Sequence, residues 1–402
     1  MANAEAGRIL IAGGGIGGLA LALALAKAGH DSLVLEGRPE FSIAGAGIQL
    51  GPNGTRILKA LGVADRLAPM AGVPDAVHVY RGAGGSRLAR LPLGGWIAQR
   101  HGAPYWVAHR ADLHEALLHE ARKSDRIAIE LGFQVAEVVP QGEAVAVHSE
   151  AGKVATGAAV VGADGLWSRV RRHIAPEAAP VFAGASASRI VLPADQAGRM
   201  AENAVGLWLS PGAHIVHYPV RGGREIAVVV IAEESWQSRV WDAEIDKMHL
   251  ARALECFSTD MQSTLRDAPG WRRWSLHGLA PLPRWNAGRA VLIGDAAHPM
   301  FPYLAQGGVL ALEDAFELAS LIAARPGDLP GAFAAFSQQR RERAARVQNA
   351  SRRNGTVYHL SGPAGLARDT AFRAVPGPLL MSSLDWLYGW KPAANAGRSL
   401  AR

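Results

Sequence analysis

This chain of 402 residues contains a single cysteine, Cys256, and only 19% of its residues are charged. One cysteine excludes an intramolecular disulfide and any metal site built from several thiolates, and it fits a reducing compartment. The first residues, MANAEAGR, lack the basic region of a secretory signal peptide. The apolar stretch after them is interrupted by glycines and is shorter than the roughly 20 residues that a membrane span requires. We therefore expect a cytoplasmic protein without a membrane partner.

Basic residues outnumber acidic ones, which gives a formal net charge of +7. Such a charge can attract nucleic acid, but the basic residues are spread along the chain and concentrate only between Arg340 and Arg353. That segment has helical character and few aromatic residues, so we interpret it as a solvated helix face and expect no nucleic-acid partner. A general positive field also draws in anionic substrates and cofactors. The length suits two or three domains.

Residues 8–36 have the pattern of a strand, a glycine-rich turn, a helix and a second strand: RILIAGGGIGGLALALALAKAGHDSLVLE. Gly13 permits the tight turn, Gly15 lets the backbone approach a pyrophosphate, and Gly18 lets the helix pack close to the strand. Glu36 ends the second strand, where an acid accepts hydrogen bonds from a ribose diol. We expect a dinucleotide to bind on this turn, which comprises Gly13, Gly15, Ile16, Gly17 and Gly18.

Two further buried strands run into an acid beside a glycine. Residues 158–163 lead into Asp164-Gly165, and residues 290–293 lead into Gly294-Asp295. In open α/β sheets, ligands bind at the carboxyl ends of parallel strands, which is where both acids stand. A glycine-rich turn at Gly307-Gly308 then opens a helix, whose first N–H groups would stabilise negative charge.

From roughly residue 180 to residue 273 the pattern changes to alternating strands. We expect strands at 188–192, 204–209, 214–219 and 225–231, followed by a helical pair at 245–257 and 261–266. This pattern favours an antiparallel sheet in a second domain that is inserted into the first. Residues 76–80 and 87–91 are expected to form a β-hairpin.

The expected strand at 214–219 carries two histidines and a tyrosine. Because side chains alternate along a strand, His214 and Tyr218 share one face and His217 lies on the other. Two nearby histidines suggest a metal, but no third ligand is close in the sequence, so we expect no metal site. We interpret His217 as a packing residue and His298 as a structural residue of its loop.

The three glycine-and-acid motifs, in this order along the chain, resemble those of the single-component FAD-dependent aromatic hydroxylases of the p-hydroxybenzoate hydroxylase fold. The likeness covers essentially the whole chain. The local sequences are similar to the branch that contains salicylate hydroxylase, 3-hydroxybenzoate 6-hydroxylase and 6-hydroxynicotinate 3-monooxygenase. The matching segments are residues 45–49, 109–113, 305–308, 312–315 and 385–389.

The resemblance implies an α/β fold: a Rossmann-like FAD-binding domain, an inserted antiparallel-sheet substrate domain and a helical C-terminal segment. We expect residues 1–75, 104–179 and 274–355 to form the discontinuous FAD-binding domain. Residues 76–103 and 180–273 would form the substrate-binding domain, and residues 356–402 the tail. A long helix is expected over 332–353. Prolines 363, 376 and 378 would interrupt the tail before a final short helix at 379–390.

The resemblance also assigns cofactor contacts. Glu36 and Arg38 would hold the adenosine half of FAD, Arg110 the flavin chain, and Asp295 the ribityl chain. Asp164 would serve both FAD and NAD(P)H, while Gly307 and Gly308 would face the pyrimidine end of the flavin. The remaining expected cofactor contacts are Gly47, Ile48, Val135 and Val309.

The implied activity is hydroxylation of a hydroxylated aromatic or N-heteroaromatic acid by NAD(P)H and O2, through a flavin C4a-hydroperoxide. The resemblance favours NADH over NADPH. It places His214, Tyr218 and Tyr303 at the substrate, where a histidine base would raise the electron density of the ring. Three alternatives stay open: decarboxylative hydroxylation, another flavin oxygenase such as an epoxidase, and a flavin-binding redox protein that makes no oxygenated product. We expect a small aromatic substrate and a monomer or homodimer.

Overall fold

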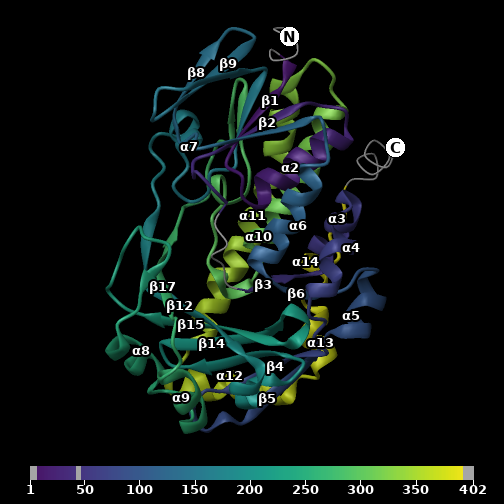
Figure 1. The fold of residues 1–402 in the computed structure, drawn as a ribbon. Helices are drawn as coiled ribbons and strands as arrows, with labels where there is room; N and C mark the ends of the chain where they lie inside the picture. Colours follow the sequence, from purple (N-terminus) through teal and green to yellow (C-terminus); the bar gives the residue numbers. More distant parts are fainter. Residues whose placement is uncertain (1–6, 42–46, 393–402) are drawn as a thin grey trace.

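The computed structural model describes residues 7–41 and 47–392 of the chain, so Gly45 and Ala46 of the motif at 45–49 lie outside the described residues. Figure 1 shows a parallel sheet in the upper half and a larger, mostly antiparallel sheet in the lower half. Helices α10 (Gly307–Ala323) and α11 (Leu329–Tyr358) run between these two levels. This mixed α/β arrangement confirms the expected fold class.

The upper sheet has strand order β18-β19-β11-β1-β2-β7, and its strands are parallel except for the edge strand β18. Because the central strands are covered on both faces, they are continuous apolar runs. Their bounds are Asn286–Ala287, Ala290–Leu292, Ala159–Gly162, Ile9–Ala12, Ser32–Glu36 and Ile127–Leu131. A three-stranded sheet of β8 (Val135–Gln141), β9 (Ala144–Ser149) and β10 (Val154–Gly157) packs nearby.

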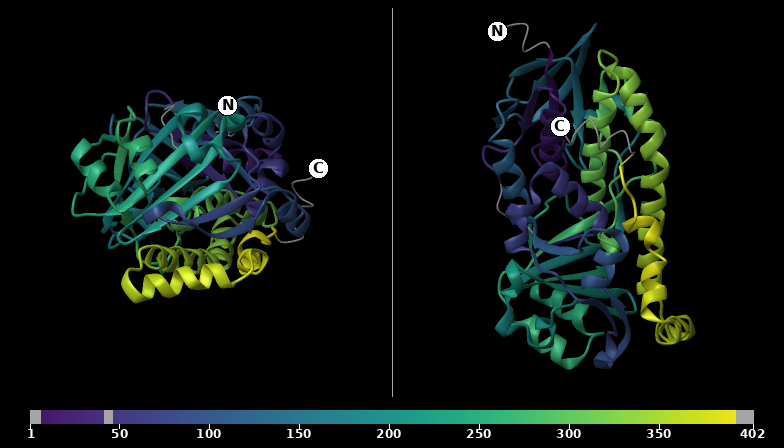
Figure 2. Two further views of the ribbon diagram at one scale, coloured as in Figure 1. Left: turned by 90° about the horizontal axis from the view of Figure 1, so that it is seen from below. Right: turned by 90° about the vertical axis from the view of Figure 1, so that its right-hand side faces the viewer.

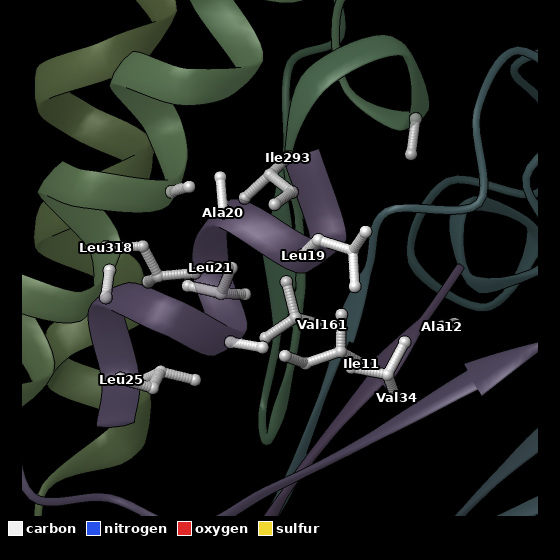
Figure 3. Close-up of a cluster of buried hydrophobic side chains, with 14 of the residues drawn as sticks. Ile11, Ala12, Leu19, Ala20, Leu21, Leu25, Val34, Val161, Ile293 and Leu318 are labelled. Carbon is white, nitrogen blue, oxygen red and sulfur yellow. The ribbon is translucent and has the colours of Figure 1, made fainter. Parts of the chain in front are cut away.

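Helix α2 (Ile16–Lys27) lies on this sheet and is buried almost all round. Its alanines and leucines are good helix formers, and Gly29, with φ of +86°, follows the C-cap residue in the left-handed conformation expected there. Figure 3 shows its side chains packed between the strands and α10. The labelled contacts include Ile11, Leu19, Leu21, Val34, Val161, Ile293 and Leu318.

The lower sheet has strand order β16-β17-β12-β15-β14-β13-β4-β5. All neighbours are antiparallel except β4 and β13, which pair in parallel. The β4–β5 hairpin comes from an earlier part of the chain than the other strands of this sheet. The strands span Ala243–Glu244, Arg272–Gly278, Val181–Pro193, Glu225–Glu233, Ala213–Val220, Val205–Ser210, Ala76–Arg81 and Arg87–Pro92. A two-stranded ribbon of β3 (Gly47–Leu50) and β6 (Trp106–His109) lies above it in Figure 1.

Helices cover both faces of the lower sheet. On one face α8 (Lys247–Leu254) and α9 (Thr259–Arg266) pack on Trp208 and Ile215. On the other, Val216 and Tyr218 share a cluster with residues of α10 and α11. Figure 2 (right) shows α11 running along one side of the molecule from the level of the parallel sheet to that of the lower sheet.

The remaining helices are short. They are α3 (Pro52–Leu61), α4 (Ala64–Leu67), α5 (Gly94–His101), α6 (Arg110–Ala121), α7 (Arg169–Ile174), α12 (Gly362–Ala374), α13 (Gly377–Ser382) and α14 (Asp385–Tyr388).

Three sequence-based predictions about helices were wrong in detail. The long helix α11 continues to Tyr358 instead of ending at residue 353. Pro376 lies in the break between α12 and α13, as predicted, but Pro363 and Pro378 stand in the first turns of α12 and α13, where no intrahelical N–H bond is lost, so these two begin helices. The segment 379–390 is not one helix but the end of α13 followed by α14.

A buried ion-pair cluster joins α10 to α11. Arg340 Nε donates to Asp314 Oδ1 at 2.8 Å, and its Nη2 donates to Glu313 Oε2 at 2.8 Å. Arg343 adds two bonds to Glu313, at 2.6 and 2.7 Å. Burial alone would raise the pKa of Asp314, but the charges of His298 and Arg340 outweigh burial and hold this pKa well below its ordinary range.

Asp314→Asn should lower the free energy of unfolding by about 3–5 kcal/mol, because it leaves Arg340 and His298 short of a buried partner. Urea denaturation of both proteins measures this. The difference should persist down to about pH 4, the ordinary pKa of an unfolded aspartate, and shrink as the pH falls further and Asp314 of the wild type is protonated. Asp31→Asn, in an exposed pair with Arg126, is the control and should cost at most about 1 kcal/mol. Equal losses from both variants would contradict the expectation.

Candidate functional site

Helix α2 starts directly after the turn that follows β1. Its N-cap residue, Gly15, supplies no side-chain cap for the first N–H groups of the helix, and the first turn of α2 has no acid. A Cβ on Gly15 would meet nothing within 4 Å, so a ligand can approach this backbone closely. A helix N-terminus in this state favours phosphate.

The neighbouring glycines of this turn are required by close packing within the chain. Gly13 has φ of +104°, and a Cβ there would lie 2.5 Å from the carbonyl oxygen of Ala163 at the end of β11. A Cβ on Gly18 would collide with the carbonyl oxygen of Gly13. Gly17 faces Ala311 of α10, and Ile16 is buried in the core. Gly15 is therefore the glycine of the motif whose open side is not filled by the chain itself, so a ligand can lie against it.

Glu36 is tied to the same turn. Its Oε2 accepts a hydrogen bond from the N–H of Gly14 at 2.9 Å, and its Oε1 accepts one from the N–H of Arg38 at 3.0 Å. From α6, Nε2 of His114 donates to the carbonyl oxygen of Gly14 at 2.8 Å, since that oxygen can only accept. The sequence reasoning missed His114. Its position one helical turn after Arg110 was the available signal.

Arg38 and Val135, two other expected cofactor residues, lie at the far side of β2. The Arg38 side chain is exposed. Val135 opens β8 and is buried in the core beside Gln134, whose amide blocks any Cβ at Gly37. Both residues therefore lie near Glu36, but no contact of either one indicates a role in ligand binding.

Asp164 follows β11 and Asp295 follows β19, at the carboxyl ends of parallel strands as the motifs predicted, and Arg110 begins α6. Asp164 Oδ2 accepts from the N–H groups of Arg169 and Val170 at the start of α7, at 2.6 and 3.2 Å, and burial raises its pKa. Asp295 and Arg110 are exposed, yet desolvation by the surrounding chain raises the pKa of Asp295 and lowers that of Arg110. The charge of Arg110 lowers the pKa of Asp295 and the charge of Asp295 raises that of Arg110, each against the effect of burial. The two side chains are therefore close enough to interact electrostatically.

The N-terminus of α10 is also uncapped by side chains, and its first turn holds no acid. A Cβ on Gly308 would lie 2.7 Å from Cδ1 of Ile48, so β3 crosses the start of this helix at close range. Val309 turns away and packs on Gly54 of α3. A Cβ on Gly47 would collide with the ring of Tyr218, which brings the expected flavin-contacting strand against the lower sheet.

His214 and Tyr303 come together, whereas Tyr218 contacts Gly47 and Ala227. The ring of His214 is fully buried, with its centroid 5.4 Å from that of Tyr303 and 5.2 Å from that of Tyr358. Desolvation and the nearby His359 lower the pKa of His214 well below its usual value. Its Nε2 is buried and has no hydrogen-bond partner among the described residues.

His217 lies on the opposite face of β14. It packs on Gly206 and its ring centroid is 6.3 Å from that of Trp208. His298 donates from Nε2 to Asp314 Oδ2 at 2.5 Å, within the ion-pair cluster of α10 and α11. Within residues 7–41 and 47–392, no three metal-ligating side chains gather into a site. In that same part of the chain, no helix combines the length and the apolarity needed to cross a membrane.

Three aromatic residues near these groups were not predicted. Tyr358 and His359 lie at the end of α11, beyond the residue where the sequence predicted the helix to end, and both contact His214. Trp241, in the connection between β15 and β16, lies with its ring centroid 5.6 Å from the guanidinium carbon of Arg110. These contacts join segments far apart in the sequence, and no local pattern signals them.

The groups along these strand ends fit a flavin dinucleotide. The open Gly15 backbone and the uncapped α2 match a pyrophosphate, and Glu36 stands one strand away for a ribose. Arg110 and Asp295 present opposite charges to solvent, and the uncapped α10 offers N–H groups to an electron-rich ring edge.

Comparison with known proteins gives the family. The profile described as FAD binding domain matches residues 7–351. The 3-hydroxybenzoate 6-hydroxylase of Polaromonas naphthalenivorans (strain CJ2) is 34% identical over 98% of each chain. The 3-amino-4-hydroxybenzoate 2-monooxygenase of Streptomyces cremeus is 38% identical over 95% of each chain. The 6-hydroxynicotinate 3-monooxygenase of Bordetella bronchiseptica is 34% identical over 86% of this chain and 91% of that protein.

Solved structures show the same fold. HpxO of Klebsiella pneumoniae, complexed with FAD and uric acid, superposes with a TM-score of 0.86 at 22% identity, over 95% of this chain and 96% of that chain. A salicylate hydroxylase substrate complex gives a TM-score of 0.81 at 25% identity, over 98% of each chain. These matches confirm the resemblance drawn from the motifs.

Glu36→Ala should weaken FAD retention by about tenfold to a hundredfold, because the N–H of Gly14 loses its acceptor and the ribose loses its own. The measurement is the Kd of FAD for the apoprotein, followed by quenching of flavin fluorescence. Glu130→Ala is the matched control, since it removes a half-buried acid from the neighbouring strand β7. Unchanged FAD affinity in Glu36→Ala would argue against the ribose role.

Proposed function

The chain belongs to the FAD binding domain family, and from this we propose that it is an FAD-dependent monooxygenase that hydroxylates a hydroxylated aromatic or N-heteroaromatic acid. NAD(P)H and O2 are its co-substrates. The names of the relatives support this substrate class, since they act on hydroxybenzoates and a hydroxynicotinate. The observation that carries the proposal is the buried His214, whose Nε2 has no hydrogen-bond partner among the described residues. It lies on β14, the strand whose Tyr218 meets Gly47 of β3.

The upper sheet would bind the cofactor. Gly15 and the first turn of α2 would hold the pyrophosphate, and Glu36 the adenosine ribose. Arg110 and Asp295 would orient the chain that leads to the flavin, and Gly307 and Gly308 would face its pyrimidine end. When bound, the flavin supplies electron transfer from NAD(P)H and the activation of O2. Residues 76–103 and 180–273 would form the domain that holds the substrate over it.

The residues of β14 would prepare the substrate ring. A hydroxyl placed against His214 Nε2 gives up its proton to a base that is neutral at neutral pH, because burial keeps the pKa of His214 low. The pKa of Tyr303 is raised to about 12 by burial and by the charge of Glu233, so its hydroxyl stays protonated and can donate a hydrogen bond. The apolar cluster around Tyr218 keeps water from this space.

The proposed function is tested by supplying monohydroxybenzoates and hydroxypyridine carboxylates to the FAD-loaded enzyme. At least one acid should accelerate NADH oxidation and give a product heavier by one oxygen atom, identified by mass spectrometry. If every acid leaves only hydrogen peroxide and no oxygenated product, the protein is not the proposed hydroxylase.

His214→Ala should leave FAD bound and reducible by NADH, but slow ring hydroxylation by roughly 10²–10⁴, the usual contribution of a general base. A larger share of the NADH consumed should then appear as hydrogen peroxide. Tyr218→Phe should show a milder form of the same uncoupling. The measurement is the ratio of product to NADH consumed.

His217→Ala is the matched control for these variants, because His217 is equally buried on the opposite face of the same strand. It should lower Tm while leaving coupling unchanged. If His214→Ala behaves in the same way, His214 is only a packing residue.

The pH dependence of kcat/KM should reflect the low pKa of His214. A base works in its unprotonated form, which is present above its pKa and is lost as pH falls through it. Because this pKa lies well below the ordinary 6.5, activity should not decline between pH 7.5 and 6.5 and should fall only in more acidic buffer. An acid limb centred near pH 6.5 would show that the base is a histidine with an ordinary pKa.

A further inference from the structure

Behind His214, two further titratable side chains continue to the protein surface. His214 Nδ1 lies 2.9 Å from Nε2 of His359, and His359 Nδ1 lies 2.9 Å from Oε1 of Glu233. The side chain of His359 is only 8% exposed, whereas that of Glu233 is 62% exposed. The three residues come from β14, the end of α11 and the end of β15.

The hydrogen-bond pattern determines which nitrogens carry protons. The Glu233 carboxylate can only accept, so His359 Nδ1 must carry a hydrogen. In a neutral His359 the other nitrogen, Nε2, then has a lone pair, and His214 must donate to it from Nδ1. Nε2 of His214 therefore carries no hydrogen and has a free lone pair. This nitrogen is the buried atom that has no partner among the described residues.

We propose that Glu233 and His359 form a proton relay that fixes His214 as the Nδ1–H tautomer and carries the substrate proton to solvent. The transfer of the substrate proton rests on the function proposed above, whereas the tautomer of His214 does not. His359 and Glu233 act through His214, so they are positioning residues of the reaction.

The proton transfers balance at each step. His214 Nε2 takes the proton of the substrate hydroxyl as the Nδ1–H bond of the same ring breaks and that proton passes to His359 Nε2. His359 in turn releases its Nδ1 proton to Glu233 Oε1, and the exposed carboxylate gives it to water. Both imidazoles end neutral and the negative charge stays on the substrate oxygen, so the relay avoids the desolvation cost of a buried imidazolium.

Among the described residues, the other titratable groups that face His214 offer no competing route. They are Tyr303 and Tyr358, whose rings lie against the imidazole. Burial and the charge of Glu233 raise the pKa of Tyr303 to about 12, and burial raises that of Tyr358. Both phenols therefore stay protonated near neutral pH, and the hydroxyl of Tyr358 donates to the carbonyl oxygen of Tyr303 at 3.2 Å.

The tautomer is tested first, on the FAD-loaded enzyme labelled with ¹⁵N-histidine and without substrate. The spectrum should show His214 with a protonated Nδ1 and a bare Nε2, assigned by its loss in His214→Ala. In Glu233→Gln this state should persist, because the amide oxygen still accepts from His359. A protonated Nε2 on His214, or a doubly protonated His359, overturns the proposal whatever the substrate is.

The relay is tested with the hydroxybenzoate that gives the fastest turnover. His359→Gln keeps a donor and an acceptor in place but cannot pass a proton, so kcat should fall by about 10², the lower part of the general-base range, with KM little changed. In His359→Ala, added imidazole should restore part of the lost rate. Glu233→Gln should give a smaller loss of kcat.

Glu202→Gln is the matched control, because Glu202 is an exposed acid bonded to the buried His78 at 3.1 Å on another strand of the same sheet. It should leave kcat and its pH profile unchanged. Wild-type kcat and no imidazole effect in the His359 variants would overturn the relay. If the wild type hydroxylates none of the aromatic acids, the proposed function and the substrate proton fail together, and the nitrogen spectra still decide the tautomer.

Discussion

Two arginines of α11 neutralise two adjacent acids of α10 inside the protein, and the segments expected to contact the cofactor are attached to this cluster. Asp314 also accepts from the N–H of Gly294, which holds the turn that presents Asp295. Glu313 accepts from Asn53 of α3, and Asn53 donates to Gln306 just before α10 begins. Removing one charged residue of this cluster leaves another buried charge without its partner, so the contacts of the cluster depend on one another.

The same two helices connect the parallel upper sheet to the lower sheet. At one end α10 packs on α2 of the dinucleotide turn (Figure 3), and at the other α11 reaches β14 of the lower sheet. These helices therefore set the distance between the carboxyl ends of the upper strands and His214. The close contact of Gly47 with Tyr218 fixes the same spacing from the opposite side.

Much of the upper sheet and its glycine-rich turn was predictable because the signals are local. The turn at Gly13–Gly18 needs glycine for reasons that lie within one strand–turn–helix unit, or one strand away at Ala163. The alternation on β14 likewise placed His214 and Tyr218 on one face and His217 on the other. The strand pairing at β4 and β13 was not predictable, since a parallel pair between distant segments leaves no periodic signature.

The sequence by itself determined the dinucleotide turn, the strand-rich insertion and the family, because spacing and periodicity are properties of neighbouring residues. Only the tertiary structure decided what surrounds the reactive groups. His359 stands 145 residues after His214, and their bond exists because α11 is long enough to carry it from the upper sheet to the lower one. Hydrogen-bond partners and burial, which set protonation, depend on the complete fold, and no local stretch of sequence contains them.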